Sequence, residues 1–444
     1  MIKNLIKKIV FGILTVEARL VLARYRPKII AVTGTVGKTT TKDAIYKALS
    51  KRLHVRKNSK SLNSEIGVPL TILGLETGWS NPIHWLSNIL IGLVEIIYWP
   101  KYPKYLVLEV GIDRPGDMEK VARWLKPDVA VLTAFGDVPV HVEFFDSPDQ
   151  VAEEKSKLIS HLKKDGAIIL NADDEKVLKL KNRAEHRVYT FGKKNGEADI
   201  VASHYSIVYE TSFGKDGHIN SGHRIPHGVS FKINYNGNSI PMAIRGAIGD
   251  QYVYPILAAL ATGISQNLPL VSMSEGLSEF KAPKGRMNLL AGENDSIIVD
   301  DSYNSSPIAA ASAVRNLTEI DNVGSKIAVL GDMTEIGRFS ASEHRKIGSL
   351  IRENKIDILI TVGRASELIN EQAMEEGMAK SKNYHFSTST EAIQTVRNYL
   401  KLGNVILVKG SQAMRMEKIT KAILLEKEKA ADLIVRQEKE WLNR

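Results

Sequence analysis

The feature that most constrains this chain is a glycine-rich loop at a strand-to-helix junction. The segment 34–40, GTVGKTT, directly follows the apolar run Lys28–Thr33 and precedes a helical stretch that begins near Thr41. Glycines let backbone N–H groups turn toward phosphate oxygens, and the new helix presents its positive N-terminus. Lys38 would reach the terminal phosphates, while a threonine hydroxyl, that of Thr39, would ligate Mg²⁺. The segment therefore predicts a site for a nucleoside triphosphate.

The loop is tighter than the common GxxxxGK[ST] form, because only two residues separate its glycines. A glycine turn without a ligand is the alternative, but such a turn would not need the sequence Gly-Lys-Thr-Thr. The loop residues assigned to the nucleotide are Gly34, Thr35, Gly37, Lys38, Thr39 and Thr40.

Apolar runs on both sides of this loop predict an α/β fold. Short buried-strand candidates alternate with helical stretches, which is typical of a doubly wound, mostly parallel sheet. These candidates are Lys28–Thr33, 105–110, 129–133, 167–170 and 187–191. Residues 195–245 break the rhythm with glycines and polar–apolar alternation, so we expect a small antiparallel subregion there.

A second α/β series follows a Pro- and Gly-containing joint at 281–286. Its strand candidates are 297–300, 326–330, 357–361 and 405–408. This pattern predicts a Rossmann-like C-terminal domain. We therefore divide the chain into a basic amphipathic helix at 1–27, a central domain at 28–283 and a C-terminal domain at 284–444, with 416–442 as a long terminal helix.

Composition narrows the class of protein. With 444 residues, the chain is long enough for two or three domains, and the absence of cysteine excludes disulfides and thiolate chemistry. Residues 1–28 hold seven basic side chains and one acidic one, Glu17, within the net charge of +10. No signal-peptide cleavage site follows, and no nucleic-acid-binding module is recognisable. We expect a cytoplasmic monomer that binds no nucleic acid.

Two apolar segments leave the question of membrane contact open. Residues 1–26 carry an apolar stripe among lysines and arginines, and residues 83–99 are apolar but too short to span a bilayer. Both segments could lie on the inner face of the membrane. Alternatively, they pack on each other and cover an edge of the central domain.

Several segments, in order along residues 28–420, resemble the Mur ligases, the amide-forming enzymes of peptidoglycan synthesis. The phosphate loop TGTVGKTTTK is similar to the ATP loop of that family. The segments NSEIGVPL at 63–70, EVGID at 109–113 and VDDSYNSSP at 299–307 are similar to further family motifs, the last to that of the MurF type. Residues 330–337 and 408–417 also resemble MurF-type segments. The MurF type adds D-alanyl-D-alanine to UDP-N-acetylmuramoyl-tripeptide.

The resemblance implies ATP and Mg²⁺ as cofactors, and a muramyl peptide with an amino acid or dipeptide as substrates. The carboxylate would become an acyl phosphate that the amine then attacks, so cations rather than an acid/base triad would dominate the site.

By the same resemblance, Glu109, His141 and Lys155 would hold Mg²⁺, with Lys155 as a carbamate. Lys38, His141 and Lys155 form the catalytic set. The ATP-binding residues of the second half would be Arg286, Asp301, Tyr303 and Asn304. The substrate-binding residues would be Asn63, Ser64, Lys409 and Ser411. The alternative for each is a structural or solvent-facing role, above all for Lys155, which has further lysines nearby.

Two departures from the family pattern keep other functions open. At 249–255 the chain reads GDQYVYP instead of the family's GxHNxxN, so we expect altered adenine recognition. Only 27 residues precede the first strand, which leaves no room for the family's UDP-sugar domain. One rival is a Mur-like ligase with another acceptor, of the folylpolyglutamate or lipid II type. Another is a non-ligase P-loop ATP switch at a membrane or nucleic acid.

Overall fold

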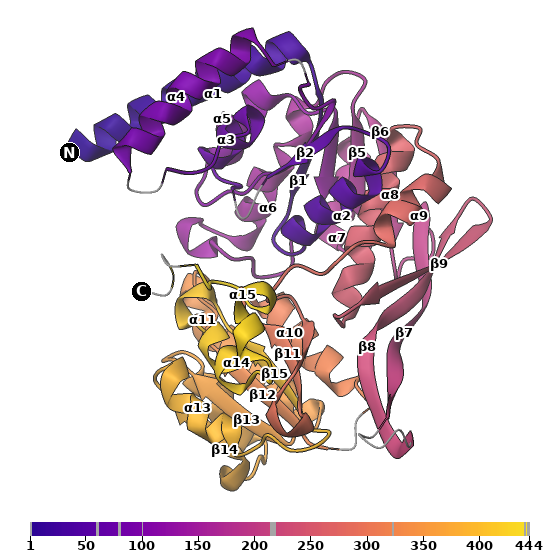
Figure 1. Ribbon diagram of the computed structural model, residues 1–444, viewed down its shortest axis with the longest axis vertical. Coiled ribbons are helices and arrows are strands. Elements are labelled where there is room, and N and C mark those ends of the chain that lie inside the picture. Colours follow the sequence, from indigo (N-terminus) through magenta and orange to yellow (C-terminus); the bar gives the residue numbers. More distant parts are fainter. Residues whose placement is uncertain are drawn as a thin grey trace.

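The computed structural model describes residues 2–58, 62–78, 81–99, 101–213, 219–321, 324–438 and 441. These residues form two α/β units, each built on its own sheet (Figure 1). In the central unit the strands are β1 Lys28–Thr33, β2 Val55–Lys57, β3 Tyr105–Glu109, β4 Val129–Leu132, β5 Ala167–Asn171, β6 Arg187–Gly192, β7 Ile200–Phe213, β8 Ile219–Tyr235 and β9 Asn238–Arg245. They are ordered β2-β3-β1-β4-β5-β6-β7-β8-β9.

The first seven strands of that order are parallel, and β8 is antiparallel to both of its neighbours, β7 and β9. The parallel strands are apolar on both faces because helices cover both; all but the first residue of β1 are buried. The helices of this unit beyond the first loop are α2 Lys38–Ser50, α5 Asp117–Leu125, α6 Pro148–Ser156, α7 Glu175–Leu178, α8 Val253–Ser265 and α9 Leu270–Leu277. The antiparallel segment at 195–245 continues the main sheet, since β7 also pairs with β6.

The C-terminal unit holds a six-stranded sheet in the order β10-β11-β15-β12-β13-β14. Its strands are β10 Asn288–Ala291, β11 Ile297–Asp301, β12 Lys326–Gly331, β13 Ile358–Val362, β14 Asn383–Phe386 and β15 Val405–Lys409. Only β10 is antiparallel to its neighbour. The helices are α10 Pro307–Thr318, α11 Ser340–Glu353, α12 Glu367–Glu375, α13 Ser389–Arg397, α14 Glu417–Ile423 and α15 Ala430–Leu433. The predicted fold class is thereby confirmed.

The long β7–β8 hairpin reaches across to the C-terminal unit (Figure 1). The backbone N–H of Asp321, just beyond α10, donates a hydrogen bond of 2.7 Å to the Tyr209 hydroxyl. The Asp321 carboxylate also pairs with Arg224 at 2.9 Å. The two units are therefore joined at the hairpin as well as through the covalent joint before β10.

The predicted terminal helix at 416–442 is wrong. α14 ends at Ile423 because Leu424 turns to an extended conformation, and the N–H of Leu425 donates to the carbonyl of Ala291 at 3.0 Å. Arg436 has a left-handed backbone with a φ of 58° and pairs with Glu417 at 3.2 Å. Helical periodicity in this charged segment is overridden by pairing with β10 and by a buried ion pair.

Two further helices of the chain are α1 Ile2–Tyr25 and α4 Pro82–Ile97 (Figure 1). They pack on each other, and α1 also packs on the short α3 Gly67–Leu73. α4 begins where the Asn81 side chain caps the N–H groups of Ile83 and His84, with Pro82 at the first position. Packing of the two apolar segments on each other, one of the two arrangements considered above, is thus observed. None of the helices within the described residues has the length and apolar character needed to cross a membrane.

One carboxyl lies in the contact between these helices. Glu17 is only 2% exposed, and neither of its oxygens has a hydrogen-bond partner among the residues that the structure describes. A Cβ atom on Gly92 of α4 would come within 2.2 Å of it, so the glycine leaves room for the carboxyl. Burial raises the pKa of Glu17 to about 7. The folded protein therefore holds this proton more tightly than the unfolded chain does.

We predict that Glu17→Gln stabilises the protein more at about pH 8 than at about pH 5. The cost of the buried charge is absent below the unfolded pKa of 4.5 and grows until the pH passes the folded pKa of about 7. Midpoints of thermal unfolding at both pH values measure the difference. Glu76→Gln, which alters an exposed carboxylate nearby, is the control. An equal change at both pH values for Glu17→Gln would contradict the assignment.

Candidate active site

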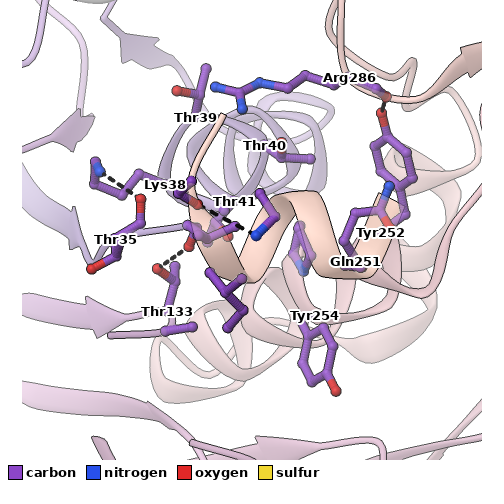
Figure 2. Close-up of a pocket in the computed structure, with 18 of the residues that line it drawn as sticks. Thr35, Lys38, Thr39, Thr40, Thr41, Thr133, Gln251, Tyr252, Tyr254 and Arg286 are labelled. Atoms are coloured by element: carbon purple, nitrogen blue, oxygen red, sulfur yellow. Dashed lines mark hydrogen bonds between the residues drawn. The ribbon is translucent and has the colours of Figure 1, made fainter. Parts of the chain in front are cut away.

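The phosphate loop lies between β1 and α2, at the carboxyl edge of the central sheet (Figure 2). Gly34 has a φ of 146°, and a Cβ atom there would lie 2.0 Å from the Thr133 hydroxyl, so glycine is required at this position. The Lys38 ammonium donates to the carbonyls of Gly34 and Thr35 at 2.8 and 3.2 Å. Burial lowers the pKa of Lys38, and the charge of Glu109 partly offsets this effect. The loop thus brings a partly buried lysine to the cleft, while the N–H groups of Thr35 and Val36 are held by the carbonyl of Ala134.

Glu109 ends β3 beside the loop and is 2% exposed. Its two carboxylate oxygens accept hydrogen bonds from the Thr39 hydroxyl at 2.8 Å and from the Asn63 amide at 2.9 Å. The Asn58 side chain accepts from the N–H of Glu109 at 2.6 Å, which fixes the strand end. Asn58 was not identified from the sequence, because a single asparagine in a loop carries no pattern.

Lys155 lies on α6 and is buried, 2% exposed, rather than on a solvated helix face. Its ammonium donates to the Thr35 hydroxyl at 3.2 Å, so it lies against the phosphate loop. Burial, together with the positive charge of Lys38, holds the pKa of Lys155 well below its usual range. The neighbouring Lys157 instead faces outward and pairs with Glu154 at 2.7 Å. Lys155 and Lys157 are two residues apart, yet the first is buried against the phosphate loop and the second faces solvent.

His141 connects the two units. It adopts a left-handed backbone with a φ of 68°, and its Nδ1 lies 3.0 Å from the Glu335 carboxylate of the C-terminal unit. Its Nε2 lies 3.7 Å from Asp113. Burial lowers the pKa of His141, with the Asp113 charge opposing and the Lys38 charge adding to the effect. Glu335 was missed as an individual residue, although it lies in the quoted segment 330–337.

The C-terminal unit and the joint supply the opposite wall of the cleft. The Arg286 guanidinium lies over the Tyr303 ring, 4.3 Å from its centroid. The Asp301 carboxylate, at the end of β11, forms an ion pair of 2.7 Å with Lys409. Lys409 also donates to the carbonyl of Asn304 at 2.9 Å. All five residues line the same cleft as the phosphate loop.

The structure places the predicted substrate-binding residues in different environments. Lys409 lines the cleft, but it is 1% exposed and forms an ion pair with Asp301. Ser411 is fully buried, and its hydroxyl accepts from the N–H of Thr334 at 2.9 Å. Ser64 is exposed outside the cleft, whereas its neighbour Asn63 lines it. A polar residue just after a strand can point into the core as readily as into a cleft.

The cleft has a volume of about 530 Å³, and residues 251–255 form one wall (Figure 2). The Gln251 amide donates to the carbonyl of Ile248 at 3.1 Å and accepts from Asn316 at 2.8 Å. The Tyr252 hydroxyl donates to the carbonyl of Arg286, and the Tyr254 hydroxyl donates to Asp173 at 3.0 Å. These polar groups are engaged with the protein itself, and altered base recognition by this segment stays a prediction. Asn316, on α10, was not identified from the sequence.

Comparison with known proteins agrees with this geometry. The Mur ligase middle domain matches residues 32–263, and the Mur ligase glutamate ligase domain matches residues 285–412. The UDP-N-acetylmuramoyl-tripeptide--D-alanyl-D-alanine ligase of Bacillus subtilis (strain 168) is 28% identical over 407 residues, covering 92% of this chain and 78% of that protein.

Solved structures give the same result. MurF ligase from Thermotoga maritima in complex with ADP has a TM-score of 0.75 and 26% identity, covering 95% of this chain and 84% of that one. Mycobacterium tuberculosis folylpolyglutamate synthase shares the fold, with a TM-score of 0.63 at 15% identity, covering 93% of this chain and 95% of that one. The fold and the cleft thus define an ATP-dependent ligase. The chain belongs to the Mur ligase family.

We predict that Lys38→Ala lowers the rate of ADP formation by about 10²–10³, because the lysine supplies charge at the transferring phosphoryl group. Release of ADP by the purified protein measures this rate. Lys47→Ala is the matched control, because Lys47 lies on the same helix with its side chain 39% exposed. Turnover at the unchanged rate in Lys38→Ala would contradict the role of the loop.

Proposed function

We propose that this chain joins a muramyl-tripeptide carboxylate to D-alanyl-D-alanine, or to a similar amine, in peptidoglycan precursor synthesis. The observation that carries the proposal is the cleft, which combines Lys38 of a phosphate loop with Arg286 and Asp301 of the second unit. The similarity to UDP-N-acetylmuramoyl-tripeptide--D-alanyl-D-alanine ligases along most of the chain supports this choice of substrates. The protein would act in the cytoplasm, where ATP and the precursor are available, and as a monomer.

The chemistry follows from the charges around the cleft. A carboxylate oxygen attacks the γ-phosphorus of ATP, the bond to ADP breaks, and an acyl phosphate forms. The amine nitrogen then attacks the acyl carbon, inorganic phosphate leaves, and the nitrogen loses a proton. Lys38 and Arg286 are positioned to stabilise the negative charge on the phosphoryl oxygens.

The residues beside the loop fit Mg²⁺. Thr39 and Glu109 offer a hydroxyl and a carboxylate 2.8 Å apart at the edge of the cleft. Mg²⁺ binds oxygen ligands and commonly uses one or two protein groups together with phosphates and water. When bound there, the ion would neutralise charge on the triphosphate. The described residues contain no cluster of three or more His, Asp or Glu side chains arranged to hold a metal, so ATP itself would complete the coordination.

Lys155 is proposed to act as a carbamate. Its lowered pKa favours the neutral amine, whose nitrogen can attack CO₂, forming an N–C bond and releasing a proton. The product is an anion, in place of a buried neutral amine, beside Lys38. His141, which lies within electrostatic reach of both lysines, would complete this side of the site.

We predict that Lys155→Ala is nearly inactive and that short carboxylic acids partly restore its activity, because they supply the missing anion. Steady-state ADP release with and without acetate measures the rescue. The control is Lys157→Ala, which removes a side chain that is 45% exposed and should leave turnover unchanged. Full activity of Lys155→Ala, or a lack of rescue, would refute the carbamate.

The substrates are tested with a panel of acceptors. Purified protein with ATP and Mg²⁺ is supplied with UDP-N-acetylmuramoyl-tripeptide plus D-alanyl-D-alanine, with folyl-glutamate plus glutamate, and with lipid II plus an amine donor. We expect release of ADP and amide formation with the first pair alone. Product formation with either of the other pairs would replace the proposed substrates by those of the rival ligase. Hydrolysis of ATP without any amide product would favour the ATP switch.

A further inference from the structure

Helix α1 exposes an apolar stripe. Ile9, Ile13, Val16 and Leu20 recur at helical spacing and are 38–54% exposed. The opposite stripe, with Leu14, Ala18 and Val21, is fully buried against the protein. An amphipathic helix at a protein surface normally turns polar residues outward. α1 therefore carries apolar side chains on its exposed side as well as on the side that packs against the protein.

Helix α4 shows the same feature more strongly. Six of its apolar side chains are 48–77% exposed, and these are Ile83, Leu86, Leu90, Leu93, Val94 and Ile97. Its buried residues are Asn88, whose amide donates to the carbonyl of Glu76, and Gly92. The more apolar side of α4 thus faces away from the protein.

The two helices run parallel, so their stripes lie on one surface. Phe11 lies against Trp85 at 6.1 Å between ring centroids, Glu17 lies against Gly92, and the Tyr25 hydroxyl donates to the carbonyl of Glu95. Figure 1 shows the pair at the end of the molecule away from the C-terminal sheet. We call the outward residues of both helices the α1–α4 face.

Exposed basic side chains lie on α1 beside its apolar stripe. Among residues 9–28, 81–99 and 101–104, the exposed charged side chains are all basic: Arg19, Arg24, Arg26, Lys28, Lys101 and Lys104. The two acids of these ranges, Glu17 and Glu95, are not exposed. One exposed acid, Glu76, lies close to α4, because the Asn88 amide donates to its carbonyl. The exposed charges of the two helices themselves, within the described side chains, are therefore basic.

We propose that the α1–α4 face binds the surface of an anionic lipid bilayer. The apolar stripes would enter the headgroup boundary while the flanking arginines and lysines contact anionic headgroups. A second copy of the chain fits less well, because the exposed charges of α1 between residues 9 and 25 are the basic Arg19 and Arg24, which would repel those of the other copy. The face lies outside the catalytic cleft, so the inference does not depend on the proposed substrates.

The test is flotation of the full-length protein with vesicles of phosphatidylglycerol and phosphatidylcholine, and with vesicles of phosphatidylcholine alone. We expect binding to the anionic vesicles at about 0.1 M salt and much weaker binding at about 1 M, where the screening length falls from about 10 to about 3 Å. Leu90→Glu with Val94→Glu should weaken binding at least tenfold, on the order expected for charging two inserted side chains.

Matched variants distinguish binding through the α1–α4 face from nonspecific adsorption of the protein to vesicles. Leu402→Glu alters a leucine of the C-terminal unit that is 54% exposed, close to the 57% of Leu90, and should bind like the unchanged protein. Arg19→Gln with Arg24→Gln should lose the preference for anionic vesicles. ADP release without vesicles should be unchanged in all variants, which confirms folding.

Three outcomes would overturn the proposal. The first is failure of the unchanged protein to float with anionic vesicles at low salt. The second is equal binding by the unchanged protein and by Leu90→Glu with Val94→Glu. The third is a stable dimer in analytical ultracentrifugation that this double variant abolishes, which would assign the face to a second copy.

Discussion

The site depends on two lysine side chains, Lys38 and Lys155, that meet at one loop. Both reach the loop around Thr35, and burial lowers the pKa of each. The charge of Lys38 lowers the pKa of Lys155 further, whereas the Glu109 carboxylate favours the charged form of Lys38. Anions such as phosphoryl groups, or conversion of the Lys155 amine to an anion, would favour the charged form of Lys38 as well. Affinity for a triphosphate thus follows from the arrangement of the lysines.

The parallel sheet explains why these groups meet. The phosphate loop follows β1, Glu109 ends β3, and Thr133 follows β4; β3 and β4 are the two neighbours of β1. Carboxyl ends of parallel strands lie at one edge, so short motifs far apart in the chain converge there. The second sheet repeats this arrangement, with Asp301 at the end of β11 and Lys409 at the end of β15.

This regularity is also why much of the fold could be predicted. Both strand series were evident as apolar runs, and the loop 34–40 identified the edge that binds phosphate. The side-chain directions could not be predicted in the same way: Lys409 ends β15 and pairs with Asp301, whereas Ser411, two residues on, is buried in the core. The prediction of a long terminal helix was wrong for a similar reason, since contacts of Leu425 and Arg436 with distant segments outweigh local periodicity. Asn58 and Glu335 act through tertiary contacts that no local pattern encodes.

The hairpin contact at Asp321 has a consequence for motion between the units. Together with the covalent joint near Met287 and the hydrogen bond from Asn316 to Gln251, it attaches the C-terminal unit to the central unit at several separate points. Contacts spread in this way oppose a change of angle between the units more strongly than the joint alone would. A rotation of the C-terminal unit would also have to separate Glu335 from His141 and Arg338 from the carbonyl of Asp146. Opening of the cleft then requires that spatially separate contacts break together, and the pairing of His141 with Glu335 reports whether one of them has broken.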